Sequence, residues 1–349
     1  MKILLVRPPY VSPFSRMKLV NVEPLELEIL LGAAVNDGHI CLIYDGILER
    51  RSLTSVLKEY NPDFAAITGY ITQRNLVLKY AETIKEYNPS IKVIVGGVHA
   101  ELNYAEFFHP TVDYIVHSGG VRPFRELLDC IQNDKSAEDI PGICFRSANN
   151  EWKSTPKIVV DPEETTIPDR SFFYQHRGKF NYLHFRPCAI VKTSYSCPHR
   201  CNFCYCCLLN EGKYLCRSVD KVVAEIADIN CENIWIVDDT FYLEHQKIKD
   251  FVRLLQENGI KKNFILYYRA DFIAGNEEMI ALLKSVGLKM VLVGLETFDD
   301  ETLQDFEKNT STRINEKCLS ILRKYDIDCT ALFVLDIDAK KEDFYNLSR

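Results

Sequence analysis

Short apolar runs alternate with segments of helical period over residues 1–120, and this alternation limits the folds open to the chain. The apolar runs, which predict strands, are Lys2–Val6, Ile40–Tyr44, Phe64–Thr68, Val93–Val95 and Tyr114–Val116. The segments between them, which predict helices, are Leu25–Val35, Ser52–Tyr60, Arg74–Tyr87 and Pro123–Gln132. Strands that alternate with helices form parallel βαβ units, so we expect an α/β domain with an open, doubly wound (Rossmann-like) parallel sheet.

A second series of the same kind begins near Cys188. Its predicted strands are Ala189–Thr193, Asn233–Val237, Phe264–Tyr268, Met290–Gly294 and Thr330–Leu335. Its predicted helices are Ser218–Ile229, Glu244–Asn258, Glu277–Val286 and Ile314–Tyr325. Five strands separated by helices predict a complete or partial (β/α) barrel of the TIM type, whose chemistry lies on the loops after the strands. No sixth strand is evident, so we interpret the sequence as a fragment or a short form.

Two different segments separate the series. Residues 142–156 predict a hairpin with Asn149–Asn150 near its turn, and the polar, proline-containing residues 161–170 predict a linker. We therefore expect a first domain at residues 1–140, a hairpin and linker at 141–185, and a barrel domain at 186–349, the last either partial or truncated at its C-terminus.

Cysteine usage indicates a metal site in a reduced protein. The chain has 13 cysteines, and seven of them lie between Cys188 and Cys216. A dense cluster in a long chain without an export signal favours a metal site over a disulfide framework. The N-terminal apolar run is too short for a signal peptide, and no stretch of 18 apolar residues is present. We expect a cytoplasmic protein without a membrane span, and the net charge of −7 argues against a broad nucleic-acid surface.

Three of these cysteines have the spacing C-x3-C-x2-C: Cys197, Cys201 and Cys204. They follow the first strand of the second series, on a loop where barrel chemistry is expected. Thiolates at such spacing bind zinc or an iron–sulfur cluster. Three cysteines leave one iron of a cubane open to a substrate. A structural zinc ion would take a fourth ligand, and His199, Cys206, Cys207 and Cys216 are available for it.

This stretch resembles the signature of the radical S-adenosylmethionine (SAM) enzymes, C-x3-C-x-aromatic-C, with Phe203 at the aromatic position. The resemblance extends to the ends of three later predicted strands, at Ile236–Phe241, Tyr268–Asp271 and Val293–Thr297. The first domain, at Val22–Leu27 and Gly38–Asp45, resembles the cobalamin (B12)-binding domain of one large subgroup of that family.

The resemblance implies a [4Fe–4S] cluster on the cysteine triad, with SAM chelated by the open iron and cleaved to a 5′-deoxyadenosyl radical. Phe203 would pack near the adenine, and Asp238 and Asp239 would contact the SAM amino group. Arg269 would pair with the SAM carboxylate, and Glu296 would reach the ribose or the methionyl end. Plainer roles stay open, as helix caps for the three acidic residues, an ion-pair partner for Arg269 and a core ring for Phe203.

The cobalamin assignment departs from the familiar pattern. The cobalt-ligating sequence D-x-H-x-x-G is absent, since Asp45 is followed by Gly-Ile-Leu-Glu-Arg. The resemblance therefore implies cobalamin bound base-off, without a histidine ligand. The residues expected to border it, after two predicted strands of the first domain, are Thr68, Gly69, Gly96 and Gly97. We interpret His99 and His117 as ordinary polar loop residues, and a first domain without any cofactor stays an alternative.

The resemblance implies an enzyme that performs radical chemistry. Its main form is cobalamin-dependent methyl transfer to an unactivated carbon, and a related cyclisation or rearrangement is the variant. The alternatives are a radical SAM enzyme without cobalamin and a non-catalytic zinc or iron–sulfur binding module. The partners implied are a small-molecule or peptide substrate and an electron donor such as flavodoxin or ferredoxin. Cys206, Cys207 and Cys216 would be inert thiols, alternative ligands or part of a second site.

Overall fold

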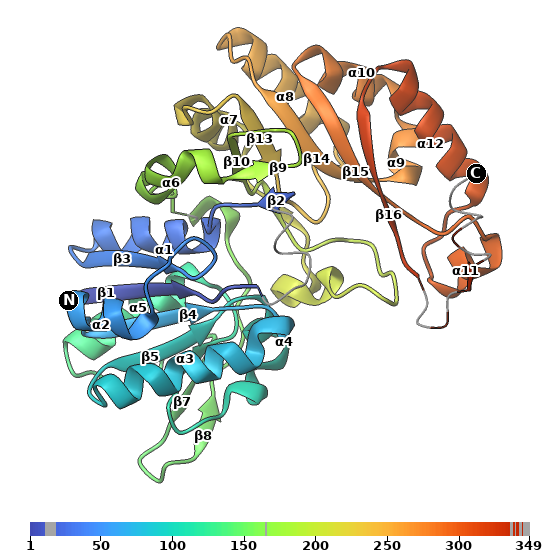
Figure 1. Ribbon diagram of the computed structural model, residues 1–349. Coiled ribbons are helices and arrows are strands. Elements are labelled where there is room, and N and C mark those ends of the chain that lie inside the picture. Colours follow the sequence, from blue (N-terminus) through green and yellow to red (C-terminus); the bar gives the residue numbers. More distant parts are fainter. Residues whose placement is uncertain (11–18, 165, 336–337, 339, 342–343, 345–349) are drawn as a thin grey trace. The chain divides into compact units, whose positions relative to one another are not determined.

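The computed structural model describes residues 1–349 except 11–18, 165, 336–337, 339, 342–343 and 345–349 (Figure 1). The chain divides into two compact units. Unit 1 comprises Met1–His184 and Leu209–Glu211, and unit 2 comprises Phe185–Leu208 and Gly212–Arg349. The domain limits expected from the sequence stay a prediction. Among the described residues, no helix has the length and apolar character that crossing a bilayer needs.

Unit 1 is built on a seven-stranded sheet in the order β3-β1-β4-β5-β6-β7-β8. Its strands are β1 (Lys2–Arg7), β3 (Ile40–Asp45), β4 (Phe64–Thr68), β5 (Lys92–Gly96), β6 (Tyr114–Val116), β7 (Ile143–Arg146) and β8 (Trp152–Ser154). The first five are parallel, and β7 and β8 are the predicted antiparallel hairpin at one edge. The predicted doubly wound sheet is confirmed.

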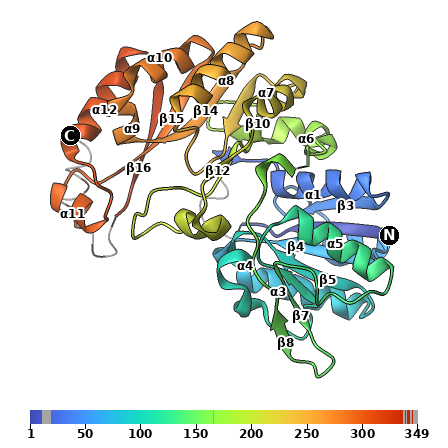
Figure 2. The ribbon, with the colours of Figure 1, turned by 180° about the vertical axis from the view of Figure 1, so that it is seen from behind.

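Helices cover both faces of this sheet (Figure 2). On one face lie α1 (Leu25–Asn36) and α5 (Val121–Gln132), and on the other α2 (Leu53–Tyr60), α3 (Arg74–Tyr87) and α4 (Val98–Asn103). Alternate residues of β1 enter the two cores, Ile3 and Leu5 on the first face, Leu4 and Val6 on the second. Each fully buried aliphatic side chain contributes about 1.5–3 kcal/mol. A strand that is buried on both faces has a continuous run of apolar residues, and this run allowed β1 to be predicted from the sequence.

The short helix α4 was not predicted, nor were three short elements at the junction of the linker with the start of unit 1. They are β2 (Val20–Asn21), β9 (Asn181–Tyr182) and α6 (Ser171–His176). The two strands pair with each other in an antiparallel manner. Buried Arg170 donates to buried Glu23 at 2.9 Å, and the Phe173 N–H donates to Glu28 at 2.8 Å. The chain after the expected linker is thus fixed to the start of α1 by polar contacts that hydrophobic periodicity does not reveal.

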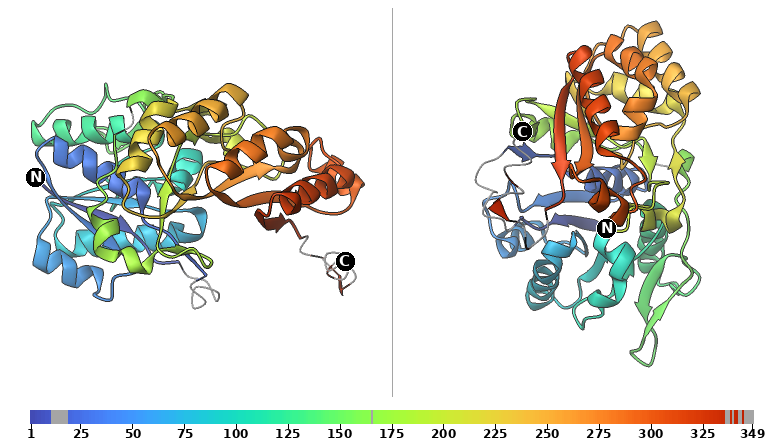
Figure 3. Two further views of the ribbon diagram at one scale, coloured as in Figure 1. Left: turned by 90° about the horizontal axis from the view of Figure 1, so that it is seen from above. Right: turned by 90° about the vertical axis from the view of Figure 1, so that its right-hand side faces the viewer.

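Unit 2 contains a five-stranded parallel sheet whose strands follow chain order: β10 (Cys188–Val191), β13 (Asn233–Ile236), β14 (Asn263–Arg269), β15 (Leu288–Glu296) and β16 (Asp328–Phe333). Its helices are α7 (Val219–Asp228), α8 (His245–Glu257), α9 (Ala270–Gly275), α10 (Glu277–Ser285), α11 (Asp300–Asp305) and α12 (Thr312–Lys324) (Figure 3). Sequential order is the order of a barrel, and no described strand joins β16 back to β10. The predicted partial barrel is confirmed, while α9 and α11 were too short for the sequence to indicate.

A buried ion pair joins the carboxyl ends of β1 and β3. Arg7 donates to both oxygens of Asp45, Nε to Oδ1 at 3.0 Å and Nη2 to Oδ2 at 2.6 Å. Both side chains are nearly inaccessible to solvent. A second aspartate–arginine pair of unit 1, Asp37 with Arg125, has the same bidentate geometry but is exposed.

We expect Asp45→Asn to destabilise unit 1 by about 3–5 kcal/mol, because it leaves the buried Arg7 guanidinium without its counter-charge. The exposed counterpart, Asp37→Asn, should cost about 0–1 kcal/mol. The chain has two tryptophans, Trp152 in unit 1 and Trp235 in unit 2, so urea unfolding followed by fluorescence in a Trp235→Phe background reports unit 1. Equal losses in the two variants would contradict the role of burial.

Candidate functional site

The cysteine triad lies on one loop of unit 2, residues 196–208, which we call the cysteine loop. A two-residue strand, β11 (Ser194–Tyr195), precedes it and pairs in an antiparallel manner with β12 (Leu215–Cys216). The expectation that the loop follows the first strand of the sheet directly needs correction, because β11 stands between that strand and the loop. The β11–β12 pair brings together the two chain segments that flank the loop.

Asp238 anchors the base of the cysteine loop. Its Oδ1 accepts the Thr193 N–H at 2.6 Å and the Ser194 N–H at 3.0 Å, and its Oδ2 accepts the Thr193 hydroxyl. Burial raises the pKa of Asp238, while the charge of Lys192 and the Thr193 donors act against that rise. Both carboxylate oxygens of Asp238 therefore accept hydrogen bonds from the residues just before the loop. The expected contact of Asp238 with a SAM amino group stays a prediction.

A second buried charge, Arg217, fixes the same turn. Its Nη1 donates to the Lys192 carbonyl at 2.8 Å and pairs with Glu225 at 2.7 Å, and both side chains are buried. The Arg217 N–H also donates to the Thr193 carbonyl at 2.8 Å. This ion pair was not predicted, because the arginine and the glutamate are eight positions apart and only the fold brings their side chains together.

The middle of the cysteine loop is attached to the end of α11. The Asn202 N–H donates to the Phe306 carbonyl at 3.3 Å, and the Asn202 side-chain amide donates to the Asp305 carbonyl at 2.5 Å. The neighbouring ring of Phe203 meets Phe306 edge-on at 5.1 Å and stays 43% exposed. Phe203 is therefore not a core residue, and its face is accessible to a planar ligand.

The three thiols of the triad have different surroundings. Burial raises the pKa of Cys197 to about 11 and also raises the pKa of Cys201, against the opposing charge of Arg269. The pKa of Cys204 is lowered to about 6, chiefly because the Cys206 thiol donates to its sulfur. Cys206 is thus a neighbour of the triad that the sequence left undecided. Within the described ranges, no three His, Cys, Asp or Glu side chains converge on a point as a single metal ion requires.

Asp239 differs from its neighbour Asp238. Its Oδ2 is buried and has no hydrogen-bond partner among the described residues. Its charge acts on Lys192, Cys197 and Cys204, so it faces the side of the loop that carries the triad. Buried carboxylate oxygens are usually satisfied, and an ammonium group is the partner that satisfies one best. Neither aspartate caps a helix, because the next helix starts at His245 with Glu244 as its N-cap.

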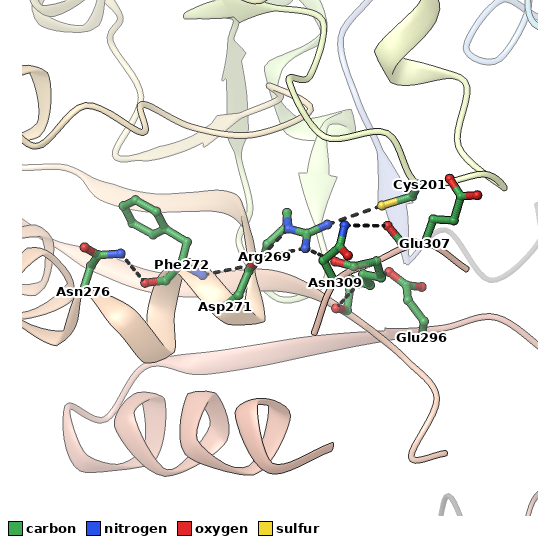
Figure 4. Close-up of polar contacts among 10 residues, drawn as sticks. Cys201, Arg269, Asp271, Phe272, Asn276, Glu296, Glu307 and Asn309 are labelled. Carbon is green, nitrogen blue, oxygen red and sulfur yellow. Dashed lines mark hydrogen bonds and ion pairs between the residues drawn. The ribbon is translucent and has the colours of Figure 1, made fainter. Parts of the chain in front are cut away.

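A chain of charged groups runs from Cys201 to the end of β15 (Figure 4). Arg269 Nη1 donates to the Cys201 sulfur at 3.3 Å, and Nη2 donates to the Lys308 carbonyl at 2.5 Å. The Lys308 ammonium, which is buried, donates to Glu296 Oε1 and to the Gly294 carbonyl, each at 2.5 Å. Arg269 also pairs with Asp271. Lys308 and Asp271 were not predicted, since neither belongs to the triad motif.

Glu296 adopts a strained backbone conformation, with φ at +61°. A non-glycine residue there is uncommon and is maintained by its surroundings. Gly294 allows the ion pair beside it, since a Cβ at that position would lie 2.2 Å from Glu296 Oε1 and 2.9 Å from Lys308 Nζ. Glu296 does not cap α11, whose N-cap is Asp299. Its expected reach to a ribose or a methionyl group stays a prediction.

In unit 1 the four residues expected to border cobalamin lie at the carboxyl ends of β4 and β5, and β4 is one of the two strands where the sheet order reverses. A Cβ on Gly97 would lie 2.5 Å from Thr68 Oγ1, and one on Gly69 would lie 2.8 Å from Val77. These two glycines are therefore required by the packing of the protein itself. A Cβ on Gly96 would meet its nearest atom, the Val116 carbonyl oxygen, at 3.7 Å, which is an ordinary van der Waals contact, so packing does not require a glycine there.

The interpretation of His99 and His117 as ordinary polar loop residues needs a correction, because both side chains are buried. His99 lies in α4 and contacts Glu106 at 3.0 Å, and His117 contacts Ser154 at 3.3 Å. Burial lowers the pKa of His117. At the position of the absent cobalt-ligating pattern, Asp45 is engaged by Arg7. The residues present there fit cobalamin without a histidine ligand and do not fit the histidine-ligated form.

Comparison with known proteins divides the chain in a similar way. Residues 20–128 match the family model "B12 binding domain", and residues 191–348 match the model "Radical SAM superfamily". Hopanoid C-3 methylase of Methylococcus capsulatus is 25% identical over 99% of this chain. Anaerobic magnesium-protoporphyrin IX monomethyl ester cyclase of Synechocystis is 21% identical over 98% of this chain.

Among solved structures, the cobalamin-dependent S-adenosylmethionine radical enzyme OxsB, with aqua-cobalamin and S-adenosylmethionine bound, superposes with a TM-score of 0.81 at 18% identity and covers the whole chain. This likeness shows the fold. The chain spans 52% of OxsB, 66% of the hopanoid methylase and 70% of the cyclase.

The adjacent aspartates give a matched test of the loop anchor. We expect Asp238→Asn to destabilise unit 2 by at least about 1.5–3 kcal/mol, because an amide replaces one charged acceptor oxygen by a donor that faces N–H and O–H groups. Asp239→Asn removes none of the hydrogen bonds at the base of the loop and should destabilise unit 2 by at most about 0.5 kcal/mol. Urea unfolding followed by Trp235 fluorescence in a Trp152→Phe background measures both. A larger loss in the Asp239 variant would reverse the two assignments.

Proposed function

The chain belongs to the radical SAM enzymes that carry a B12-binding domain, and we propose that it cleaves SAM at a [4Fe–4S] cluster to drive cobalamin-dependent methyl transfer to an unactivated carbon. The observation that carries the proposal is the cysteine loop, where three thiols, an unpartnered carboxylate oxygen and a guanidinium lie together at the carboxyl side of a parallel sheet. Barrel enzymes perform their chemistry at this side.

The thiolates of Cys197, Cys201 and Cys204 would hold the cluster. When bound, the cluster supplies the electron that divides SAM into methionine and a 5′-deoxyadenosyl radical. The protein positions the thiolates. Asp238 and Arg217 fix the turn before Cys197, and Asn202 attaches the middle of the loop to α11. The pKa of Cys204, lowered to about 6, favours the thiolate form that binds metal.

The SAM contacts follow from the charges that the site leaves unsatisfied. Asp239 receives the SAM ammonium, because its Oδ2 is buried without a partner. The exposed ring of Phe203 packs near the adenine. Glu296 holds Lys308 and lies at the ribose or methionyl end. The contacts of Asp238 support a positioning role for it rather than a SAM contact.

In unit 1, Thr68, Gly69, Gly96 and Gly97 would border cobalamin, and no histidine stands at the position of the usual cobalt-ligating pattern. Support comes from the place of these residues at the carboxyl ends of β4 and β5 and from the Arg7–Asp45 pair, which engages the aspartate at which the absent cobalt-ligating pattern would begin. When bound, cobalamin supplies the methyl group to be transferred.

The reaction catalysed could also be a related cyclisation, which the magnesium-protoporphyrin cyclase relative favours as a second candidate. Either reaction needs a substrate and a reductant. We propose a small molecule or a peptide as substrate and a flavodoxin or ferredoxin as electron donor. A cytoplasmic location and the absence of a nucleic-acid partner stay predictions.

The first experiment is purification without oxygen, reconstitution with iron, sulfide and hydroxocobalamin, and visible and electron paramagnetic resonance (EPR) spectroscopy. We expect a cubane signal that SAM perturbs, with cobalamin retained base-off. Cys201→Ala should lose the cluster and SAM cleavage, whereas Cys207→Ala, a loop thiol outside the triad, should keep both. Zinc without a cluster in the wild-type protein would overturn the enzyme assignment, and a cluster without retained cobalamin would favour a radical SAM enzyme that lacks cobalamin.

The role of Asp239 has its own test. Asp239→Asn should weaken SAM binding about 10–100-fold, the equivalent of a hydrogen bond to a charged group, with the cluster content unchanged. Anaerobic equilibrium binding of labelled SAM to the reconstituted protein measures the affinity. Asp250→Asn, an exposed aspartate on α8, controls for the change in net charge. An unaltered SAM affinity in Asp239→Asn would remove this residue from the SAM site.

A further inference from the structure

The guanidinium of Arg269 is almost fully engaged. Of its five N–H donors, four have partners. Nε donates to Asp271 Oδ1 at 2.9 Å, and Nη2 donates to Asp271 Oδ2 at 3.0 Å and to the Lys308 carbonyl at 2.5 Å. Nη1 donates to the Cys201 sulfur at 3.3 Å. One N–H, on Nη1, is left, so a bidentate clamp on a SAM carboxylate would require the pair with Asp271 to break.

The partners of Arg269 are themselves held in place. Asp271 Oδ1 accepts the Phe272 N–H at 3.0 Å at the start of α9. The Lys308 carbonyl belongs to a residue whose buried ammonium is fixed by Glu296 and by the Gly294 carbonyl. The side chain of Arg269 is only 13% exposed. A planar fork held on two sides in this way presents a fixed N–H to the sulfur of Cys201.

We propose that Arg269 is a positioning residue for the cluster: it holds the Cys201 thiolate by an N–H···S hydrogen bond and raises the reduction potential of the cluster. This inference rests on the proposed function, since it needs the cluster. Reduction adds one electron, from the external donor, and makes the cluster more negative. A cation and an N–H donor at a ligand sulfur stabilise that reduced state more than the oxidised one.

Lys308 is a second positive group whose charge acts on Cys201. Its ammonium is paired with Glu296, so the net charge it adds is small. The effect on the cluster therefore comes from Arg269, whose guanidinium contacts both Asp271 and the Cys201 thiolate. Among the described residues, neither Cys197 nor Cys204 accepts a hydrogen bond from an arginine or a lysine, which makes Cys201 the ligand whose bond to iron this fork would tune.

The test is a redox titration of the reconstituted whole chain without SAM, monitored by the EPR signal of the reduced cluster. In Arg269→Gln the midpoint should become more negative, with about a tenfold lower reduced-to-oxidised ratio at a fixed potential, or about 59 mV for one electron. Arg269→Lys keeps the charge but loses the fork, and should shift less in the same direction. Arg253→Gln, an exposed arginine on α8 paired with Asp250 and Glu257, is the matched control and should not shift.

The outcomes separate this inference from the proposed function. A wild-type protein that assembles no cubane overturns the proposed function and this inference with it. A wild-type protein with a cubane, and Arg269 variants that keep both the cluster and the wild-type midpoint, overturns this inference alone. Where Arg269→Gln fails to retain the cluster, Arg269→Lys decides. Resonance Raman spectra then add a second readout, since loss of the N–H donor should strengthen an iron–thiolate stretch in the lysine variant.

Discussion

The arrangement of the candidate site depends on one buried carboxylate, that of Asp238. It takes two backbone N–H groups and one hydroxyl from Thr193 and Ser194, the residues at which the chain leaves the sheet for the cysteine loop. A loop with three thiols has no apolar core to fix it, so its orientation must come from polar contacts at its base. The donors around Asp238 offset part of the cost of burying its charge, and a neutral side chain there would leave some of these donors without an acceptor and loosen the loop.

The fold was predictable where the buried positions of an element produce a periodic pattern of apolar residues in the sequence. The strands Phe64–Thr68 and Tyr114–Val116 and the helix Arg74–Tyr87 were predicted to the residue, because each is bounded by polar or turn-forming positions. The two-residue strands β2, β9, β11 and β12 were not, since two residues carry no period. Their positions are set by contacts between distant segments, such as the pairing of Val20 with Tyr182.

The candidate site also has a part that the sequence predicts and a part that only the structure shows. The three cysteines of the triad lie close together in the sequence, so their spacing alone identified them. Their role as a cluster site stays a prediction from that motif. Asp238 and Asp239 are adjacent residues of the same type, and only the structure distinguishes their surroundings. Asp238 faces Thr193, and Asp239 faces the triad. Lys308 follows α11 in a segment without a chemical motif, and its contact with Glu296 depends on the missing Cβ of Gly294.

The hydrogen-bond partners of the charged groups indicate which of these groups is available to a ligand. Asp238 is satisfied by donors of the loop base, Arg269 by Asp271, Lys308 and Cys201, and Glu296 by Lys308. Asp239 alone in this set has a buried oxygen without a partner among the described residues. An unsatisfied buried carboxylate destabilises the apo protein, and a cationic ligand removes that penalty when it binds. Within the described residues the site thus leaves one buried carboxylate oxygen, Asp239 Oδ2, without a hydrogen-bond partner and available to an ammonium.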